Sequence, residues 1–489
     1  MKNGVRMFSV AVAAGLVGFT ALAEGGIVTT NEITASSSED IVIAADEVLQ
    51  VKVNSGTLKL SGYISGEGKI YKIGAGKLEF DYHTNTFSGG IHVSAGVLTS
   101  NSQNADTTVF GSGPIRIDSG NGAQLNVVTR PRNPIEFVGS SSTSKSGLVI
   151  GAQAYLYGDI VAHGDLYITD GYGSKPNDRN ASKAVIGKAT TSLVIDPGYK
   201  LAAAPNPTYQ FVCPITADLV KGYWADNSKY VTDDLCPTHG CVGAFLFDNT
   251  NTIGKVEIDQ IRFRCNKANA LKGTVVEFTG EHLCDGWGYL EVVGVDQDFA
   301  ALITPNTVTA GCQISNSTAT AVTITLSGKP SLTADGVLRL CGAFNPIHVL
   351  PDLPADFTQI FRDCEVPLES ELTLNSGTIG FTGTATATGV SKVSLGNEAS
   401  ISIGSGCTPF ADNPIVLSIA LGTTINLEND LVVQKLLVDG AELPAGEYTE
   451  SPLFTITGGG ILTVSEGSDL ETIKMVVVPE GETVTGVTI

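Results

Sequence analysis

Two adjacent aspartates, Asp233 and Asp234, are the residues of this sequence best suited to acid–base chemistry. Enzymes that hydrolyse glycosidic bonds use a pair of carboxyl groups, one as the acid and the other as the base or nucleophile. Neighbouring side chains on a strand point to opposite faces, however, so adjacency in sequence does not place both in one site. A solvated acidic turn is the alternative, and the pair is a catalytic candidate only if the protein is an enzyme.

The nine cysteines are the second set of reactive side chains. If the chain is exported, an oxidising compartment favours disulfides, and an odd number leaves one thiol over or paired between molecules. Buried free thiols are one alternative. A zinc site with Cys236, His239 and Cys241 is another, but paired-cysteine zinc sites usually have two recognisable halves and no second half is visible. The candidate disulfide cysteines are Cys213, Cys236, Cys241, Cys265, Cys284, Cys312, Cys341, Cys364 and Cys407. No metal and no cofactor is predicted.

A short acidic, basic and thiol cluster follows at residues 281–287 and contains Glu281, His282 and Cys284. A cysteine nucleophile needs an imidazole within hydrogen-bond reach of its sulfur, which proximity in sequence does not guarantee. A disulfide cysteine beside a turn is the alternative for Cys284.

Both tryptophans, Trp224 and Trp287, lie in the same middle region, close to Tyr223 and Tyr289. The flat apolar faces of such rings can stack on sugar rings. The alternative is that Trp224 and Trp287 form the small core of this region.

Composition and charge exclude several classes of protein. The 489 residues include 29 Lys and Arg against 50 Asp and Glu, a formal charge of −21. This charge argues against nucleic acid as a partner, because phosphates are bound by clustered cations, and against anionic lipid surfaces. With 42% hydrophobic and 16% charged residues the chain is not disordered in composition. The 56 glycines and the many Val, Ile and Thr residues are typical of an all-β protein with tight turns.

The N-terminus predicts a cleaved signal peptide over residues 1–23. Lys2 and Arg6 precede the apolar run 7–20, and Ala21-Leu22-Ala23 provides a small-x-small cleavage site. The apolar run is shorter than the roughly 20 residues that cross a bilayer. No later segment is long and apolar enough, so no transmembrane segment is expected in the mature chain. The predicted location is extracellular or at the cell surface.

A repeat dominates the first hundred residues of the mature chain. A glycine, followed two residues later by a leucine, recurs with a stride of 20 residues from Gly56 and Leu58 to Gly96 and Leu98. Units this short cannot bury an apolar face alone, but stacked units share one core. The stride favours a right-handed parallel β-helix with rungs of about 20–24 residues. A β-meander is the alternative.

The repeat pattern divides the chain into segments. Rungs are expected over 24–204 and again over 311–464, where Ile379, Ile401 and Ile425 lie 22 and 24 residues apart. Residues 205–310, with the tryptophans and six cysteines in or just beyond them, form a middle module. This module is either an inserted domain or a set of decorated rungs. Residues 465–489 are a C-terminal tail.

Residues 66–98 and 110–117 resemble the autotransporter-associated β-strand repeat, which contains the same glycine-punctuated strands. Residues 438–448 and 456–464 are similar to a terminal segment common in large exported proteins with these repeats. The resemblance implies an exported β-helical passenger of the kind that forms stalks and adhesins, and it transfers no catalytic residue. Residues 465–489 are too few for the membrane barrel that follows such passengers, so another export route is expected.

The sequence therefore predicts a non-catalytic, exported surface or extracellular protein, structural or adhesin-like, with glycans or surface proteins as partners. A polysaccharide-cleaving β-helix enzyme is the alternative, and a carbohydrate-binding protein without turnover is a third. Three or more carboxylates converging on one concave face, within ~6.5–9.5 Å of each other, would favour the enzyme. Carboxylates scattered over opposite faces would favour the stalk.

Overall fold

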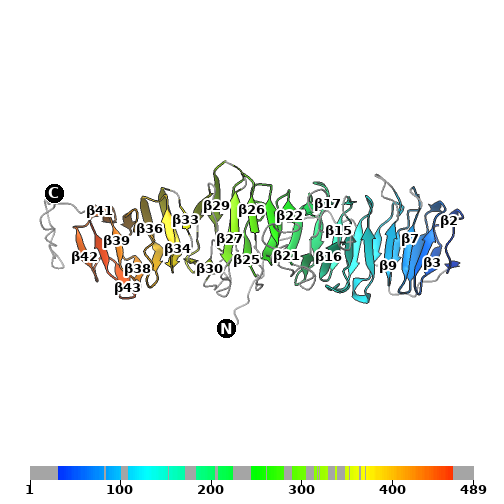
Figure 1. Cartoon of the computed structure of the whole chain (residues 1–489), viewed down its shortest axis with the longest axis horizontal. Helices are drawn as coiled ribbons and strands as arrows, with labels where there is room; N and C mark the ends of the chain where they lie inside the picture. The colour runs from blue at the N-terminus through cyan, green and yellow to red at the C-terminus, as the bar shows by residue number, and fades with distance from the viewer. Residues whose placement is uncertain are drawn as a thin grey trace, which may run out of the picture.

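The chain folds as a β-solenoid, an elongated rod of parallel strands stacked from one end to the other in a computed structural model (Figure 1). The predicted all-β, parallel β-helical fold is confirmed. One short 3-10 helix, η1 (Ser119–Asn121), is the exception to strands and turns among the described residues. The structure describes residues 31–81, 84–100, 108–151, 154–170, 183–203, 208–223, 244–259, 261–279, 289–303, 313–316, 318, 320–328, 336–338, 347–351, 353–362, 365–368 and 370–465.

The largest sheet has 21 strands and begins as two parallel stacks. The first stack contains β1 (Asn31–Ile33), β3 (Val48–Lys52), β6 (Lys69–Ile73), β8 (Ile91–Val93), β10 (Ile115–Ile117), β12 (Ile135–Val138), β15 (Ile160–His163) and β18 (Leu193–Ile195). The second contains β4 (Thr57–Leu60), β7 (Lys77–Phe80), β9 (Val97–Ser100), β11 (Gln124–Val127), β13 (Leu148–Ile150), β16 (Leu166–Asp170) and β19 (Lys200–Ala203). Both stacks join at β21 (Ile215–Gly222), which continues through β23 (Thr252–Ile258), β25 (Thr274–Phe278), β27 (Gln297–Ile303), β29 (Val322–Leu326) and β31 (Ile347–Pro351).

Other sheets complete the rod, and all of their strand pairs are parallel except two near the C-terminal end. A seven-stranded sheet contains β14 (Tyr155–Leu156), β17 (Lys183–Ile186), β20 (Thr208–Phe211), β22 (Ala244–Phe247), β24 (Arg262–Cys265), β26 (Tyr289–Val292) and β28 (Gln313–Asn316). A nine-stranded sheet near the C-terminal end contains β30 (Gly336–Leu338), β32 (Thr358–Arg362), β34 (Glu371–Thr382), β36 (Lys392–Ile403), β37 (Val416–Ile419), β38 (Thr424–Leu427), β40 (Lys435–Val438), β41 (Ala441–Glu442) and β43 (Thr455–Thr457). Smaller sheets pair β2 (Ile41–Ile43) with β5 (Ile64–Gly66), β33 (Glu365–Pro367) with β35 (Thr386–Thr388), and β44 (Leu462–Val464) with β39 (Leu431–Val433) and β42 (Gly446–Tyr448).

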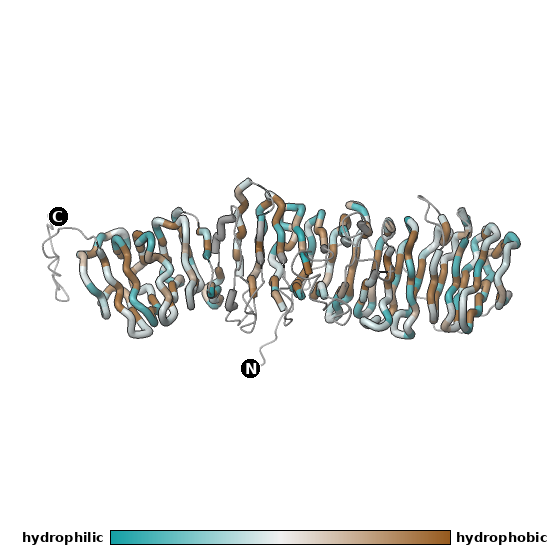
Figure 2. The backbone as a smooth tube through the Cα atoms, viewed as in Figure 1, coloured by the Kyte–Doolittle hydropathy of each residue, from teal (hydrophilic) through white to brown (hydrophobic). Residues whose placement is uncertain are grey.

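The core consists of apolar side chains stacked in register from turn to turn. Hydrophobic and hydrophilic residues alternate along the strands (Figure 2), so one face of each strand points inward. The repeated leucines Leu58, Leu78 and Leu98 lie directly above one another and are buried. Ile379, Ile401 and Ile425 are aligned in the same way. The stride in the sequence thus equals one turn of the solenoid, as predicted.

A glycine at a corner permits two turns to approach closely. Gly96 has φ +72°, and a Cβ atom there would lie 2.3 Å from the carbonyl oxygen of Gly76 in the preceding turn. An L side chain would therefore require both a strained backbone and displacement of the neighbouring turn.

Buried asparagines join the corners of consecutive turns. The Asn85 side chain accepts a hydrogen bond from the Ile64 amide at 2.8 Å and donates to the Val109 carbonyl at 2.7 Å. Asn251 does the same between Ile215 and Ala270, at 2.9 and 2.8 Å. These side chains satisfy backbone groups that the bends remove from the sheet ladders.

The middle region continues the solenoid wherever the structure describes it. β19 pairs with β21, β21 with β23 and β23 with β25, all in parallel. Inside, Phe211, Phe245 and Phe263 stack across three turns, with centroid distances of 5.5 and 4.6 Å. The described part of residues 205–310 thus consists of solenoid turns that share the common core.

Candidate functional site

Most of the sequence-predicted site residues lie outside the described residues. These are Asp233 and Asp234, Trp224 and Trp287, the 281–287 cluster with Glu281 and His282, His239, and the cysteines Cys236, Cys241, Cys284, Cys312, Cys341 and Cys364. The catalytic, glycan-stacking and metal-binding hypotheses built on them stay predictions.

The described cysteines are buried in the solenoid. Cys213 and Cys265 are free thiols, so the structure does not support a disulfide at either of them. Inside an apolar core a thiol packs like a small hydrophobic side chain. Cys213 donates a weak hydrogen bond to the Ile186 carbonyl at 3.6 Å. Cys407, also buried, donates to the Ala385 carbonyl at 3.5 Å.

Burial also lowers the reactivity of two of these thiols, Cys213 and Cys265. It raises the pKa of Cys213 to about 12 and raises the pKa of Cys265 as well. Since the thiolate is the reactive form, neither residue is suited to be a nucleophile or a metal ligand at neutral pH.

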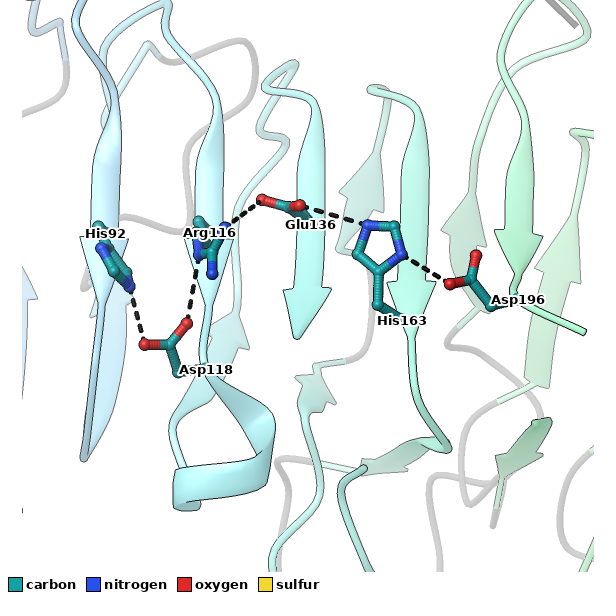
Figure 3. A network of polar contacts seen from close by, with 6 residues as sticks. All are labelled: His92, Arg116, Asp118, Glu136, His163 and Asp196. Carbon is teal, nitrogen blue, oxygen red and sulfur yellow. Dashed lines mark hydrogen bonds and ion pairs between the residues drawn. The ribbon is translucent and has the colours of Figure 1, made fainter. Parts of the chain in front are cut away.

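The most extended polar arrangement that the structure describes lies on the outer face of β8, β10, β12 and β15. We call it the charge ladder; its members are His92, Arg116, Asp118, Glu136, His163 and Asp196 (Figure 3). The register of the parallel strands creates it, because His92, Arg116 and Glu136 occupy the same outward position on consecutive turns. His163 ends β15, and Asp196 follows the next strand of the stack.

Short contacts connect the whole ladder. The Asp118 carboxylate lies 2.8 Å from Nε2 of His92 and 3.3 Å from Nε of Arg116. Arg116 also reaches Glu136, with Nη1 at 3.5 Å from the carboxylate. The ladder thus crosses from one turn to the next through alternating acids and bases.

His163 connects the far half of the ladder. Its Nε2 lies 3.3 Å from Glu136 and its Nδ1 lies 2.8 Å from Asp196. Ionised carboxylates only accept hydrogen bonds, so both contacts are hydrogen bonds at once only when the ring is an imidazolium.

The environment of Asp118 favours its ionised form. Partial burial alone would raise its pKa, but the hydrogen bond and charge of His92, together with Arg116, outweigh burial and lower the pKa of Asp118 below its usual value. His92 itself is held between Asp118 and the ring of Tyr71, whose centroid is 5.0 Å away. Its Nδ1 is buried and has no hydrogen-bond partner among the residues that the structure describes.

This geometry is better suited to holding turns together than to catalysis. A general base must present a free nitrogen or oxygen to the substrate. In His92 one nitrogen contacts Asp118 and the other is buried, while both nitrogens of His163 face carboxylates. The carboxylates of Asp118 and Glu136 both contact the Arg116 guanidinium, which lies between them. The ladder therefore acts as a clamp across successive turns.

Similar but shorter clamps occur on other turns. Glu79 lies 2.8 Å from Lys59 and 3.2 Å from Lys77. On β21, β23 and β25 a second clamp joins Lys221, Glu257, Lys255 and Glu277. A third places the buried Glu291 carboxylate against Arg262 and Arg264.

Sequence reasoning missed all of these clamps. Alignment of the outward residues turn by turn was the signal that would have revealed them.

No described group of His, Cys, Asp and Glu side chains is arranged to hold a metal ion. A shallow hollow at the first turns is lined by Thr34, Ala35, Ser36, Lys52, Val53, Asn54, Ser55, Thr57 and Leu58. It offers no acid paired with a base. The described residues also contain no helix long and apolar enough to cross a membrane.

No family model, curated protein or solved structure matches the chain. The resemblance to the autotransporter-associated repeat stays a prediction.

Proposed function

We propose that the chain is a non-catalytic, exported protein that serves as a rigid stalk at the cell surface or in the extracellular space. The observation that carries the proposal is the charge ladder, which connects consecutive turns on the outside of a continuous apolar core. A rod reinforced on both its inside and its outside resists bending and local opening. Such a rod is suited to presenting a surface at a distance.

Two further properties support the stalk. Stacked turns leave few unpaired strand edges along the rod, which limits unwanted pairing with other chains. The formal charge of −21 keeps such a surface soluble and discourages self-association. The N-terminal signal-like segment and the resemblance to exported passengers favour display outside the cell.

Localisation and turnover test this proposal together. The full chain is expressed in a Gram-negative host, and external protease is added to intact cells. We expect the mature chain in the medium or on the cell surface; a chain found only in the cytosol would contradict export.

The purified mature chain, Glu24 onward, is then assayed for new reducing ends on acidic and neutral polysaccharides. We expect none. New ends that disappear in the Asp233→Asn/Asp234→Asn double variant would replace the stalk with the polysaccharide-cleaving alternative.

A further inference from the structure

A second outward-facing cluster crosses three consecutive turns at the start of the seven-stranded sheet. We call it the cation–tyrosine strip; its members are Arg130, Tyr155, Tyr157 and Lys188. Backbone hydrogen bonds fix their order: the Tyr155 amide donates to the Thr129 carbonyl at 3.1 Å, and the Gly187 amide donates to the Leu156 carbonyl at 2.7 Å. Arg130 therefore lies one turn before the tyrosines and Lys188 one turn after them.

Burial alternates over Tyr155, Leu156 and Tyr157, the two residues of β14 and the one that follows, and this alternation turns both tyrosine rings outward. Leu156 between them is fully buried, whereas Tyr155 and Tyr157 are half-buried and lie on the outer face. Their ring centroids are 5.7 Å apart and the rings are tilted by 39°. The two rings form one continuous aromatic surface.

A cationic side chain lies over each tyrosine ring. The guanidinium carbon of Arg130 lies 4.3 Å from the centroid of Tyr155, and Nζ of Lys188 lies 4.3 Å from the centroid of Tyr157. Within the described residues neither cation forms an ion pair with a carboxylate. The clamps differ in this respect, since Arg116 and Lys255 each contact two carboxylates.

Among the described residues the strip therefore presents two positive charges that no carboxylate pairs with, on a chain of formal charge −21. A ring face stabilises an exposed cation by only about 0.5–1 kcal/mol, and it leaves the cation able to contact an anion. Parallel strands lie about 4.8 Å apart, so the turns of Arg130 and Lys188 are separated by about 10 Å. A ligand that engages both must carry at least two separated acid groups.

We propose that the cation–tyrosine strip binds an acidic polysaccharide, one that carries carboxylate or sulfate groups on successive sugars. This inference rests on the proposed function, since it names the class of ligand that the stalk presents its surface to. The Arg130 guanidinium can bind an acid group through two parallel hydrogen bonds, and Lys188 supplies the second charge. The tyrosines supply flat apolar area and phenol groups, a combination that fits the C–H faces and hydroxyl groups of sugar rings.

Nucleic acid and acidic peptides also present repeated anions. The net charge of −21 repels both, but it repels an acidic polysaccharide equally. The tyrosine surface is what favours sugars, and the test separates these ligands.

Binding is measured by calorimetry with the full mature chain and polygalacturonate, alginate and heparin as probes. Dextran is the uncharged comparison, and polyglutamate and single-stranded DNA are the polyanions that are not acidic polysaccharides. Arg130→Ala/Lys188→Ala removes both cations, and Tyr155→Ala/Tyr157→Ala removes the rings. The matched control is Lys267→Ala/Lys272→Ala, which removes two exposed lysines elsewhere on the rod. Circular dichroism verifies that each variant is folded.

We expect binding of at least one acidic probe, about tenfold weaker in each strip variant, unchanged in the control, and weakened further by salt. Equal weakening in the control would overturn the proposal, because general electrostatics would then account for binding. Equal binding of polyglutamate or single-stranded DNA would overturn it by removing the role of the sugar. Binding of none of the three acidic probes would also overturn it.

These results are distinguishable from failure of the proposed function. Absence of polysaccharide binding would not contradict export of the chain or its lack of cleavage activity. Release of reducing ends would overturn the stalk without removing the strip.

Discussion

Lys72 is a lysine buried in the apolar core, and its burial can be tested by experiment. It lies on β6 in the inward column between Val51 and Val93 and has no exposed surface. Its Nζ donates hydrogen bonds to the carbonyl oxygens of Gly74 and Ala95, both at 2.5 Å. A cation is thus enclosed among aliphatic side chains at the corner between two turns.

The burial of Lys72 makes the stability of the protein depend on pH. Desolvation lowers the pKa of Lys72 from 10.5 to about 8. Below pH 8 the ammonium is charged in both the folded and the unfolded chain. Between pH 8 and 10.5 the folded chain has lost the proton while the unfolded chain still holds it, so the free energy of unfolding rises with pH. The gap between the two pKa values corresponds to about 3 kcal/mol.

The test compares the wild type with Lys72→Met by urea unfolding, followed by circular dichroism, from pH 6.5 to 10.5. The variant retains the apolar stem but cannot be charged, so other titrations cancel in the difference. We expect the wild type to gain about 3 kcal/mol relative to the variant between pH 8 and 10.5. Lys69→Met is the control, since Lys69 lies on the same strand but is exposed, and its difference is expected to stay flat.

A flat difference for Lys72→Met would refute the reasoning. The carbonyls of Gly74 and Ala95 would then stabilise the ammonium as well as water does. A difference that falls as pH rises would show that the charged form is preferred inside the fold.

Three further predictions concern the ladder, the aromatic core and the thiols. Asp118→Asn is expected to lower the free energy of unfolding by about 1–2 kcal/mol at pH 7. Because the pKa of Asp118 is depressed in the fold, this difference should begin to shrink only below about pH 4 and should disappear as pH falls through the depressed pKa, which urea titrations at pH 7, pH 4 and pH 2 would reveal. Phe245→Ala should cost about 3–5 kcal/mol, with loss of amide protection confined to neighbouring turns in hydrogen-exchange mass spectrometry; protection lost along the whole rod would contradict nearest-neighbour coupling. Cys213 and Cys265 should stay unmodified by maleimide in the native chain and react fully in urea, as peptide mapping would show.

The residues that face the core of the solenoid were predictable from the sequence. Leu58, Leu78 and Leu98 repeat every 20 residues because each occupies the same inward position one turn apart. Inward positions must carry apolar side chains, so apolar residues recur in the sequence once per turn. Lys72 departs from it: the inward phase of β6 is set by Ile70, and that phase places Lys72 in the core two residues later.

The charge ladder was not predictable by the same stride. Its contacts join residues 26, 20 and 33 positions apart, from His92 to Asp118, Arg116 to Glu136 and His163 to Asp196. Insertions at the corners lengthen a turn without changing the register of the strands that follow. The hydrophobic phase within each strand is preserved, but the spacing between outward partners is not.

The chemistry of the outer face therefore differs from turn to turn. Every outward column is brought into register by the same inward packing, and the chemistry of the column then depends on which side chains meet. Where acids meet bases, as at Arg116 and Glu136, the charges are neutralised and the turns are clamped. Where cations meet rings, as at Arg130 and Tyr155, the positive charge stays available to an anion. A single fold thus provides both reinforcement and a binding surface. Substitutions should affect the charge ladder or the cation–tyrosine strip without affecting the other, because the ladder lies on the 21-stranded sheet and the strip lies at the start of the seven-stranded sheet.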